Sequence, residues 1–449
     1  MTWSRLYALK SYIKASLWLV PFFAMVLYWV VARITPGIGD WLVRTGRIDE
    51  TTAFYALDMA GAGTVLETIV TVNVSFLVFT FGSLLVAIQV AGGQYTPRII
   101  ATTLLRDNAI RFTVGYFVFT MLFSVRALAN LRVETNRQFN TFIAGLFGLV
   151  SIVIFLYLID YAARMLRPVS IVQRVGKDGI AVIESVYPEP TTSPRPRESS
   201  RMPASPDRTV AHAGFSGVVL AVELAGLAAQ AQRANGIIEF VPQVGDFVAV
   251  DETLFRLYGG AGAIDDRALR GYVALGSERT IEQDPTFAFR ILVDIAIKAL
   301  SAAINDPTTA VLAIDQLHRL LRLAGLRDLR GEEVSDAAGE LRLVFRTPNW
   351  EDFVHLTCIE IRHCGAGSVQ IMRRMRSMLE NLMHTLPQHR HSELRQQLDL
   401  LDRTIEAQYT FPEDLAVARI PDPQGLGGSS GMRALLESTA EDEGRDRAL

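Results

Sequence analysis

Residues 66–91, LETIVTVNVSFLVFTFGSLLVAIQVA, form an apolar stretch whose only charged side chain is that of Glu67. A helix rises about 1.5 Å per residue, so roughly 20 residues cross the hydrocarbon core of a bilayer. We therefore expect residues 66–91 to be a transmembrane helix. This expectation decides the fold class.

Three further apolar stretches of roughly 20 residues lie in the first 170 residues, one before this span and two after it. The charged fraction of the whole chain is 20%, below the roughly 25% of an average soluble protein. We expect four transmembrane helices in all. The other three cover Ala15–Ile34, Phe112–Leu131 and Phe142–Ala163.

The distribution of Lys and Arg predicts that both termini face the cytoplasm, because short cytoplasmic flanks carry an excess of these residues. With the N-terminus inside, the cytoplasmic flanks hold Arg5, Lys10, Lys14, Arg98, Arg106, Arg111, Arg164, Arg167, Arg174 and Lys177. The opposite flanks hold Arg33, Arg44, Arg47, Arg132 and Arg137. We expect a multi-pass protein of the inner (plasma) membrane.

Three charged residues within the spans need partners, because a charge in hydrocarbon is costly. Glu67 and Arg126 lie near the outer ends of their spans, so they can meet at a similar depth. Asp160 lies near the cytoplasmic end of the fourth span, so we expect its partner to be Arg98, Arg111 or Arg164. Two interpretations stay open: the charges hold helices in register, or they mark an ion or substrate path.

The span at 66–91 carries a stripe of small and polar residues. At 100° per residue, its members fall within about 60° of one another. Either the stripe packs against another helix, where small residues allow close approach, or copies from several subunits line a water-filled pore. The members are Thr68, Thr71, Ser75, Gly82, Gln89 and Gly93.

Beyond residue 170 the composition becomes that of a soluble protein. Residues 187–209, YPEPTTSPRPRESSRMPASPDRT, are rich in Pro, Ser and Arg and have too little apolar surface to fold. The fold class is thus membrane α-helical with a cytoplasmic α+β region. We expect a transmembrane domain (1–170), a connecting segment (171–186), a disordered linker (187–209), a small β-rich unit (210–275), a helical unit (276–419) and a disordered tail (420–449).

The β-rich unit contains VGDFVAVDETL, residues 244–254. This spacing resembles hairpins of biotinyl and lipoyl carrier domains and of related barrel-sandwich hybrids, which implies a small β-barrel or sandwich. Because no lysine lies between Lys177 and Lys298 to hold a prosthetic group, we expect no carrier function. The predicted elements are a strand at Gly217–Glu223, a helix at Leu224–Ala234, and strands over Ile237–Leu257 with turns at Val244–Asp246 and Asp251–Thr253.

In the helical unit, Asp-Pro-Thr at residues 284–286 and 306–308 predicts two helix starts, because Asp is a good N-cap and Pro fits the first helical position. Arg290, Asp294 and Lys298 stand four residues apart on one helix face. This ladder either faces solvent or contacts a neighbouring subunit or a ligand. The predicted helices are Thr286–Ile304, Thr308–Leu323, Glu351–Leu386 with a break near Gly365, and Ser392–Tyr409.

Several function classes lack their signatures. A formal charge of −3 argues against nonspecific nucleic-acid binding, which depends on a basic face. No lysine lies in a phosphate-binding G-x-x-x-x-G-K-[ST] loop, and no G-x-S-x-G or H-E-x-x-H pattern occurs. On one continuous helix, His355, Cys358 and Cys364 do not converge on a metal ion. We expect no catalytic residue, no metal and no cofactor.

Three motifs carry a resemblance to a known family: VAIQVAGGQYTPRII (Val86–Ile100), EQDP (Glu282–Pro285) and ALSAAINDPTTA (Ala299–Ala310). In this order after four spans, they resemble a bacterial family of predicted membrane proteins known as domain of unknown function 2254. The resemblance covers nearly the whole chain outside the linker and the tail. It implies the membrane topology and a cytoplasmic C-terminal part, and it implies no catalytic residue.

We expect a homo-oligomeric channel or transport-type protein of the lipid bilayer that passes a small ion and has a cytoplasmic regulatory or assembly domain. The alternative is a membrane-tethered sensor or scaffold whose cytoplasmic domain binds a protein partner or a small anion, since helix N-termini bind anions. A membrane enzyme with Asp160 as base is a third possibility. The candidate anion site is the turn formed by Asn305, Asp306, Pro307, Thr308 and Thr309.

Overall fold

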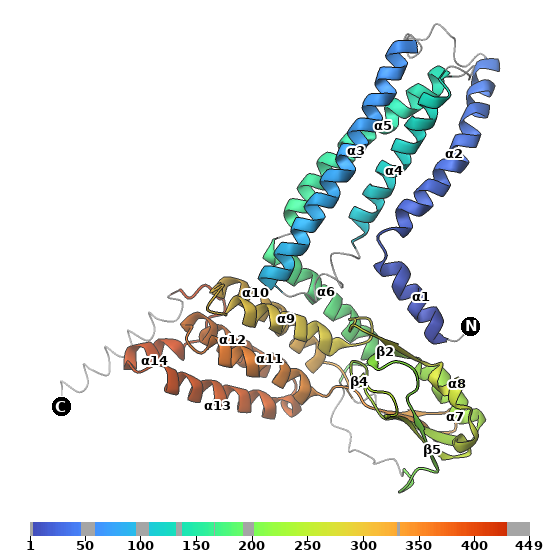
Figure 1. The fold of residues 1–449 in the computed structure, drawn as a ribbon. Helices are drawn as coiled ribbons and strands as arrows, with labels where there is room; N and C mark the ends of the chain where they lie inside the picture. The colour runs from blue at the N-terminus through green and yellow to red at the C-terminus, as the bar shows by residue number, and fades with distance from the viewer. Residues whose placement is uncertain are drawn as a thin grey trace, which may run out of the picture. The chain divides into compact units, whose positions relative to one another are not determined.

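The computed structural model describes residues 3–45, 59–95, 107–131, 137–165, 167–191, 202–329 and 333–428. The chain divides into two compact units, and Figure 1 labels many of their helices and some of their strands. The membrane unit comprises Tyr12–Gly93 and Pro97–Ser170, and the C-terminal unit comprises Met1–Ser11, Gln94–Thr96 and Ile171–Leu449. Predictions on Arg47, Arg98, Arg106, Arg132, residues 192–201 and residues 429–449 lie outside the described residues.

The described part of the membrane unit contains four helices long and apolar enough to cross a membrane, which confirms the predicted number of spans. The spans are Leu19–Gly39, Met59–Gly93, Asn108–Ala129 and Phe139–Met165. They lie in α2 (Leu19–Arg44), α3 (Met59–Val90) with its π-helical continuation η2 (Ala91–Tyr95), α4 (Asn108–Ala129) and α5 (Arg137–Met165).

The first span begins later than predicted. A separate helix, α1 (Trp3–Ala15), ends before it, and three non-helical residues, 16–18, precede α2. Pro21 lies in the first turn of α2, where the missing N–H leaves no intrahelical bond unmade. The break therefore lies before the proline.

Apolar side chains of α3, α4 and α5 form the core of the membrane unit. Two layers illustrate this: Phe123 of α4 belongs to the same buried cluster as Leu66 and Ile69 of α3, and the ring of Phe76 stacks on that of Phe155 with centroids 3.9 Å apart. Close approach of α5 to α3 depends on Gly148, where a Cβ would lie 2.9 Å from Cγ1 of Ile69.

The described part of the C-terminal unit contains two sheets. All strand pairs are antiparallel except β3 with β8. The five-stranded sheet has the order β1 (Arg208–Ala211), β5 (Thr253–Gly259), β3 (Gly236–Phe240), β8 (Leu341–Phe345), β7 (Glu333–Ser335), and the three-stranded sheet has the order β4 (Phe247–Val248), β2 (Gly217–Val222), β6 (Val273–Gly276).

The predicted strands and the short helix α7 (Leu224–Arg233) are present, but the hairpin expected at VGDFVAVDETL is not. β5 pairs with β3, with Ile238 opposite Leu257, whereas β4 pairs with β2 of the other sheet. The positive φ angles of Gly245 (96°) and Asp251 (68°) turn the chain on either side of β4. The described strands form two open sheets and no closed barrel.

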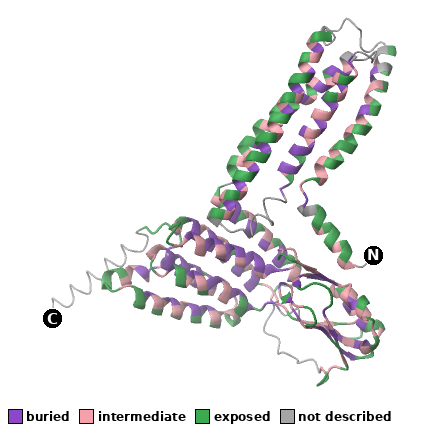
Figure 2. Ribbon diagram, in the orientation of Figure 1, coloured by how far each residue is buried: buried purple, intermediate pink, exposed green. Residues whose placement is uncertain are grey.

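In the C-terminal unit α9 packs against α10 and α11, and most of its side chains are buried (Figure 2). α9 ends five residues earlier than predicted, because the chain turns at Asn305 (φ 49°) and the Asp306 amide bonds to the Ala299 carbonyl. Besides α7, the helical segments are α6 (Pro168–Val186), η4 (Gly260–Ala263), α8 (Asp266–Arg270), α9 (Pro285–Ala299), α10 (Pro307–Gly325), α11 (Trp350–Gly365), α12 (Val369–Thr385), η5 (Gln388–Arg390), α13 (His391–Gln408) and α14 (Pro412–Ala418).

Both ends of the segment expected to be an unfolded linker are structured. Tyr187 is buried and its hydroxyl donates to the Pro348 carbonyl at 3.0 Å. At the other end, Arg208 and Thr209 belong to β1. Composition alone missed these contacts because the partners lie far away in sequence.

Candidate functional site

The polar stripe of α3 lies on the side of the helix that the rest of the membrane unit leaves exposed. The exposed members are Thr68, Thr71, Ser75, Gly82 and Gln89, together with Gly93 of η2. The hydroxyls donate to carbonyls one turn earlier: Thr68 to Thr64 at 2.7 Å, Thr71 to Glu67 at 2.9 Å and Ser75 to Thr71 at 2.9 Å. Among the described residues, the stripe therefore lies outside the packed core of the membrane unit.

The packed side of α3 holds a polar group that sequence analysis missed. Asn73 is fully buried, and its Nδ2 donates to the Ile69 carbonyl at 2.8 Å. Its Oδ1 has no hydrogen-bond partner in the described structure. Ser124 of α4 is also fully buried. The sequence signal for these buried groups was a polar residue within an apolar run. Helical periodicity was used to identify the stripe, and Asn73 and Ser124 do not belong to it.

The charges within the spans are placed as follows. Asp160 forms an ion pair with Arg164, one of its three predicted partners. Arg111 donates instead to the Ile13 carbonyl at 3.0 Å. Glu67 is exposed and borders a cavity at the end of α4 that carries Leu128. The Glu67–Arg126 pair stays a prediction.

A buried carboxylate at the start of α4 was not predicted. Asp107 is 5% exposed, and its Oδ1 accepts from the Ala109 amide at 2.9 Å as the helix N-cap. The Tyr161 hydroxyl of α5 donates to its Oδ2. The hydrogen bond between Tyr161 and Asp107 joins α4 to α5. An Asp just before an apolar run could have predicted the N-cap role of Asp107.

The turn predicted to bind an anion is already occupied by a carboxylate of the chain. Asp306 caps α10: its Oδ1 accepts from the Thr309 amide at 3.0 Å and its Oδ2 from the Thr309 hydroxyl at 2.5 Å. Asn305 and Thr308 are exposed. An anion at this helix end would have to displace or tolerate the Asp306 charge.

The charged ladder of α9 contacts a neighbouring helix of the same chain. Arg290 bonds to Asp294 within α9 and reaches Glu360 of α11 with both terminal nitrogens, one of them 3.0 Å from Oε2. This two-point ion pair lowers the pKa of Glu360. The ladder thus joins α9 to α11, a role that neither alternative from the sequence included.

A cavity of about 580 Å³ opens in the C-terminal unit and brings the VGD turn together with the EQDP motif. This volume lies within the usual range of small-molecule sites. Sequence analysis missed it, because its walls come from seven separate parts of the chain. They include Trp3 of α1, Ser185 of α6, Glu223 and Val244, Asp284 at the start of α9, and Glu333, Phe345 and Arg346 near β7 and β8.

Asp284 is the buried polar group of this cavity and is 2% exposed. Its Oδ1 accepts from the Phe287 amide at 3.1 Å and from the Thr286 hydroxyl. Its Oδ2 has no hydrogen-bond partner among the described residues. Burial raises the pKa of Asp284, although the cap hydrogen bonds and the Arg279 charge oppose the shift.

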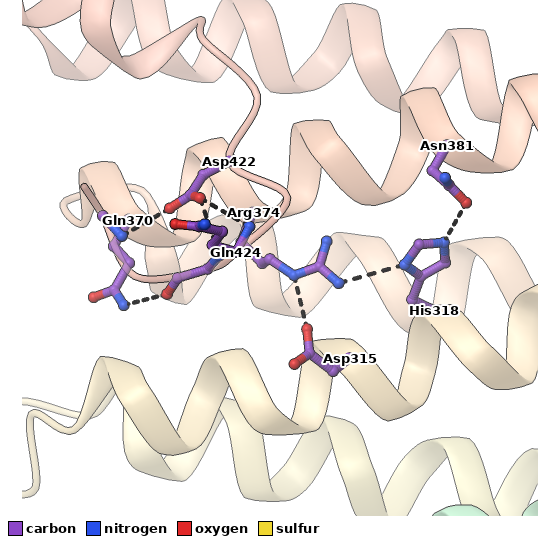
Figure 3. A network of polar contacts seen from close by, with 9 residues as sticks. Asp315, His318, Gln370, Arg374, Asn381, Asp422 and Gln424 are labelled. Carbon is purple, nitrogen blue, oxygen red and sulfur yellow. Dashed lines mark hydrogen bonds and ion pairs between the residues drawn. The ribbon is translucent and has the colours of Figure 1, made fainter. Parts of the chain in front are cut away.

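A second polar cluster fastens the chain after α14 to α12 (Figure 3). Asp422 is fully buried and accepts from the amides of Gln424, Gly425 and Gly427. Arg374 pairs with Asp315 at 2.7 Å, and its Nη2 lies 3.4 Å from Nδ1 of His318. Gln370 of α12 donates to the Gly425 carbonyl at 2.6 Å, so residues 420–428, expected to belong to a disordered tail, are bound to α12.

Titratable groups elsewhere add no candidate metal centre. Within the described ranges, no group of three or more His, Cys, Asp or Glu side chains could hold a metal ion. Cys358 is buried, which raises the pKa of its thiol to about 12, and Cys364 is exposed. The buried thiol is thus protonated at neutral pH.

The apolar helices of the membrane unit define a multi-pass membrane protein. A family model described as "Predicted membrane protein (DUF2254)" matches residues 14–381, and the chain belongs to this family. It is similar to uncharacterized proteins of Mycobacterium tuberculosis and Mycobacterium bovis, each 25% identical over 435 residues that cover 91% of this chain and 80% of the relative. No solved structure matches the chain.

Proposed function

We propose that this protein forms a homo-oligomer of the channel or transport type through the exposed stripe of α3 and passes a small ion. The C-terminal unit regulates or assembles the oligomer and carries no catalytic activity. In this proposal the protein lies in the inner membrane with both termini in the cytoplasm, as the Lys and Arg distribution favours.

The exposure of the stripe carries the proposal. Apolar residues share the exposed face, for example Val78 and Leu85 at 68% and 62% exposure, so part of this face suits lipid. The exposed amide of Gln89 does not suit lipid, because a polar side chain in contact with hydrocarbon is energetically costly. A neighbouring subunit or a water-filled pore would remove that cost.

Ion flux from liposomes tests this proposal. The stripe variant combines Ser75→Leu with Gln89→Leu. The matched control combines Val74→Leu with Phe81→Leu, two apolar exchanges at exposed positions of the same helix. We expect flux of K⁺ or Cl⁻ from wild type and the control and a loss of most of it in the stripe variant. No flux from any protein, or equal flux from all three, refutes the proposal.

A membrane-tethered sensor is the second candidate, and the cavity at Asp284 favours it. A sensor needs a pocket that a small molecule can enter, and 580 Å³ is sufficient. Thermal unfolding of the full chain in detergent, with cationic, neutral and anionic compounds including phosphate, tests this candidate. Ser185→Trp narrows the cavity from an exposed position of α6, so ligand-induced stabilisation should fall in this variant. Equal shifts in both proteins, or none, count against a sensor.

A further inference from the structure

The two Asp-Pro-Thr helix caps of the chain differ in the hydrogen bonding of one carboxylate oxygen. At α10, both carboxylate oxygens of Asp306 accept hydrogen bonds from Thr309, at 3.0 and 2.5 Å. At α9, Oδ1 of Asp284 accepts the bonds that cap the helix, and Oδ2 accepts none from the described residues. Capping therefore explains both oxygens of Asp306 but only one oxygen of Asp284.

Burial makes this difference consequential. Asp284 is 2% exposed, so bulk water cannot solvate Oδ2 as it solvates a surface carboxylate. A buried acceptor without a donor costs about 1–3 kcal/mol, and more when it is charged. Asp284 lines the cavity, and the turn at Gly245 covers Oδ2, so a molecule in the cavity supplies the missing donor when this turn moves slightly aside.

No described residue supplies a donor to Oδ2. Gly245 of the VGD turn lies beside Oδ2, where a Cβ would come within 2.4 Å of this atom. Gln283 directs its Oε1 to the Val222 amide at 3.0 Å. Among the described residues nothing donates to Oδ2, so a ligand in the cavity can supply the donor.

The other cavity walls indicate what charge this group carries. Glu223, Glu333 and Asp284 line the cavity as acidic residues, against Arg346 in the lining and the nearby charge of Arg279. Trp3, Phe240 and Phe345 add aromatic surface, and aromatic faces attract cations. An excess of acidic over basic groups beside aromatic rings disfavours anions and favours an organic cation.

We propose that the cavity binds a small organic cation, with an ammonium group that donates to Oδ2 of Asp284 and an apolar body that packs against the aromatic side chains. This inference rests on the second candidate function, in which the cavity takes a ligand, and adds the chemical class of that ligand. It does not depend on ion flux through the membrane unit.

Three probes of the same shape and different charge test the inference. They are para-fluorobenzylamine (cationic), para-fluorobenzyl alcohol (neutral) and para-fluorobenzoate (anionic), each titrated with the full chain in detergent micelles and followed by fluorine NMR line broadening. We expect saturable broadening of the amine, weaker broadening of the alcohol and none of the benzoate. Tighter binding of the alcohol or the benzoate overturns the ligand class and keeps the sensor candidate, whereas no binding of any probe overturns both.

Matched cap variants distinguish amine binding at Asp284 from nonspecific partition of the probes into detergent. Asn caps helices about as well as Asp, so Asp284→Asn keeps the helix start and removes the charge. We expect roughly tenfold weaker amine binding in Asp284→Asn and unchanged binding in Asp306→Asn. Equal amine binding in both variants and wild type overturns the proposal. If Asp284→Asn does not fold, Ser185→Trp decides, and unchanged amine binding in that variant overturns it.

Discussion

Gly245 lies against the carboxylate of Asp284, so that a Cβ at position 245 would come within 2.4 Å of Oδ2. The glycine also has a φ of 96°, which L side chains rarely adopt. We expect Gly245→Ala to lower the free energy of unfolding by about 2–4 kcal/mol, because strain and overlap add. Thermal and denaturant unfolding of the purified protein measure this loss.

A substitution at Gly339 separates the contribution of backbone strain from that of steric overlap. Its φ is 82°, but nothing lies within 4 Å of the position that a Cβ would take. Gly339→Ala therefore carries strain without overlap, and we expect a loss of about 1 kcal/mol. Equal losses in the two variants would mean that the Gly245–Asp284 contact does not limit the side chain at 245.

His318 makes stability depend on pH. Burial, and then the charge of Arg374, lowers the pKa of His318 below its ordinary 6.5. Between the two pKa values the unfolded chain binds more protons than the folded chain. The contribution of neutral His318 is thus fully present above about pH 6.5 and is lost as the pH falls through this window.

We expect the Tm of wild type to fall more steeply below pH 6.5 than that of His318→Asn. His363→Asn is the control, since His363 is exposed and its removal should leave the slope unchanged. Parallel Tm curves for wild type and His318→Asn between pH 4.5 and 7.5, a window of about two units below and one above the ordinary His value, would contradict this prediction.

Arg373 holds the segment after α14 against α12. It is 1% exposed and donates to the carbonyls of Ile420 and Gly428, each at 3.0 Å. Because hydrogen bonds to charged groups contribute about 1.5–3 kcal/mol, we expect Arg373→Met to destabilise the protein by about 2–3 kcal/mol. Faster hydrogen exchange at the Gly425 and Gly427 amides should accompany this loss.

An exposed arginine provides the comparison. Arg403 pairs with Asp399 on α13, with both side chains more than half exposed. Arg403→Met should cost less than about 1 kcal/mol and leave exchange at Gly425 unchanged. If the two substitutions had the same effect, the packing of residues 420–428 would not depend on the buried guanidinium.

Local patterns predicted the helices well. The apolar length of residues 66–91 requires no knowledge of the rest of the chain, and Asp284 and Asp306 mark their helix starts through bonds to residues three positions away. The parallel pairing of β3 with β8, with Ile238 opposite Leu343, joins strands about 100 residues apart. No local pattern encodes such a pairing.

For the candidate sites too, local features could be predicted from the sequence and features that depend on distant segments could not. Helical periodicity placed Thr68, Thr71 and Ser75 on one helix face, and in the structure all three lie in α3 and are exposed. It could not say that this face is exposed, which depends on where α4 and α5 pack. The free oxygen of Asp284 depends on the VGD turn and on walls from distant segments, so two identical sequences, at 284 and 306, look equivalent until both are folded.

The contact between α3 and α5 depends on the absence of a side chain at Gly148. A Cβ there would lie 2.9, 3.2 and 3.3 Å from three carbons of Ile69, which is buried and has little room to move. Gly145, one turn earlier on the same helix, has nothing within 4 Å of its Cβ position. We expect Gly148→Val to force α3 and α5 apart and to lower the Tm in detergent, at a cost of about 1–3 kcal/mol. Gly145→Val changes the same residue type in the same helix without this overlap, so its Tm should stay close to that of wild type. A similar Tm for the two valine variants would show that α5 does not approach α3 as closely as the Ile69 contact requires.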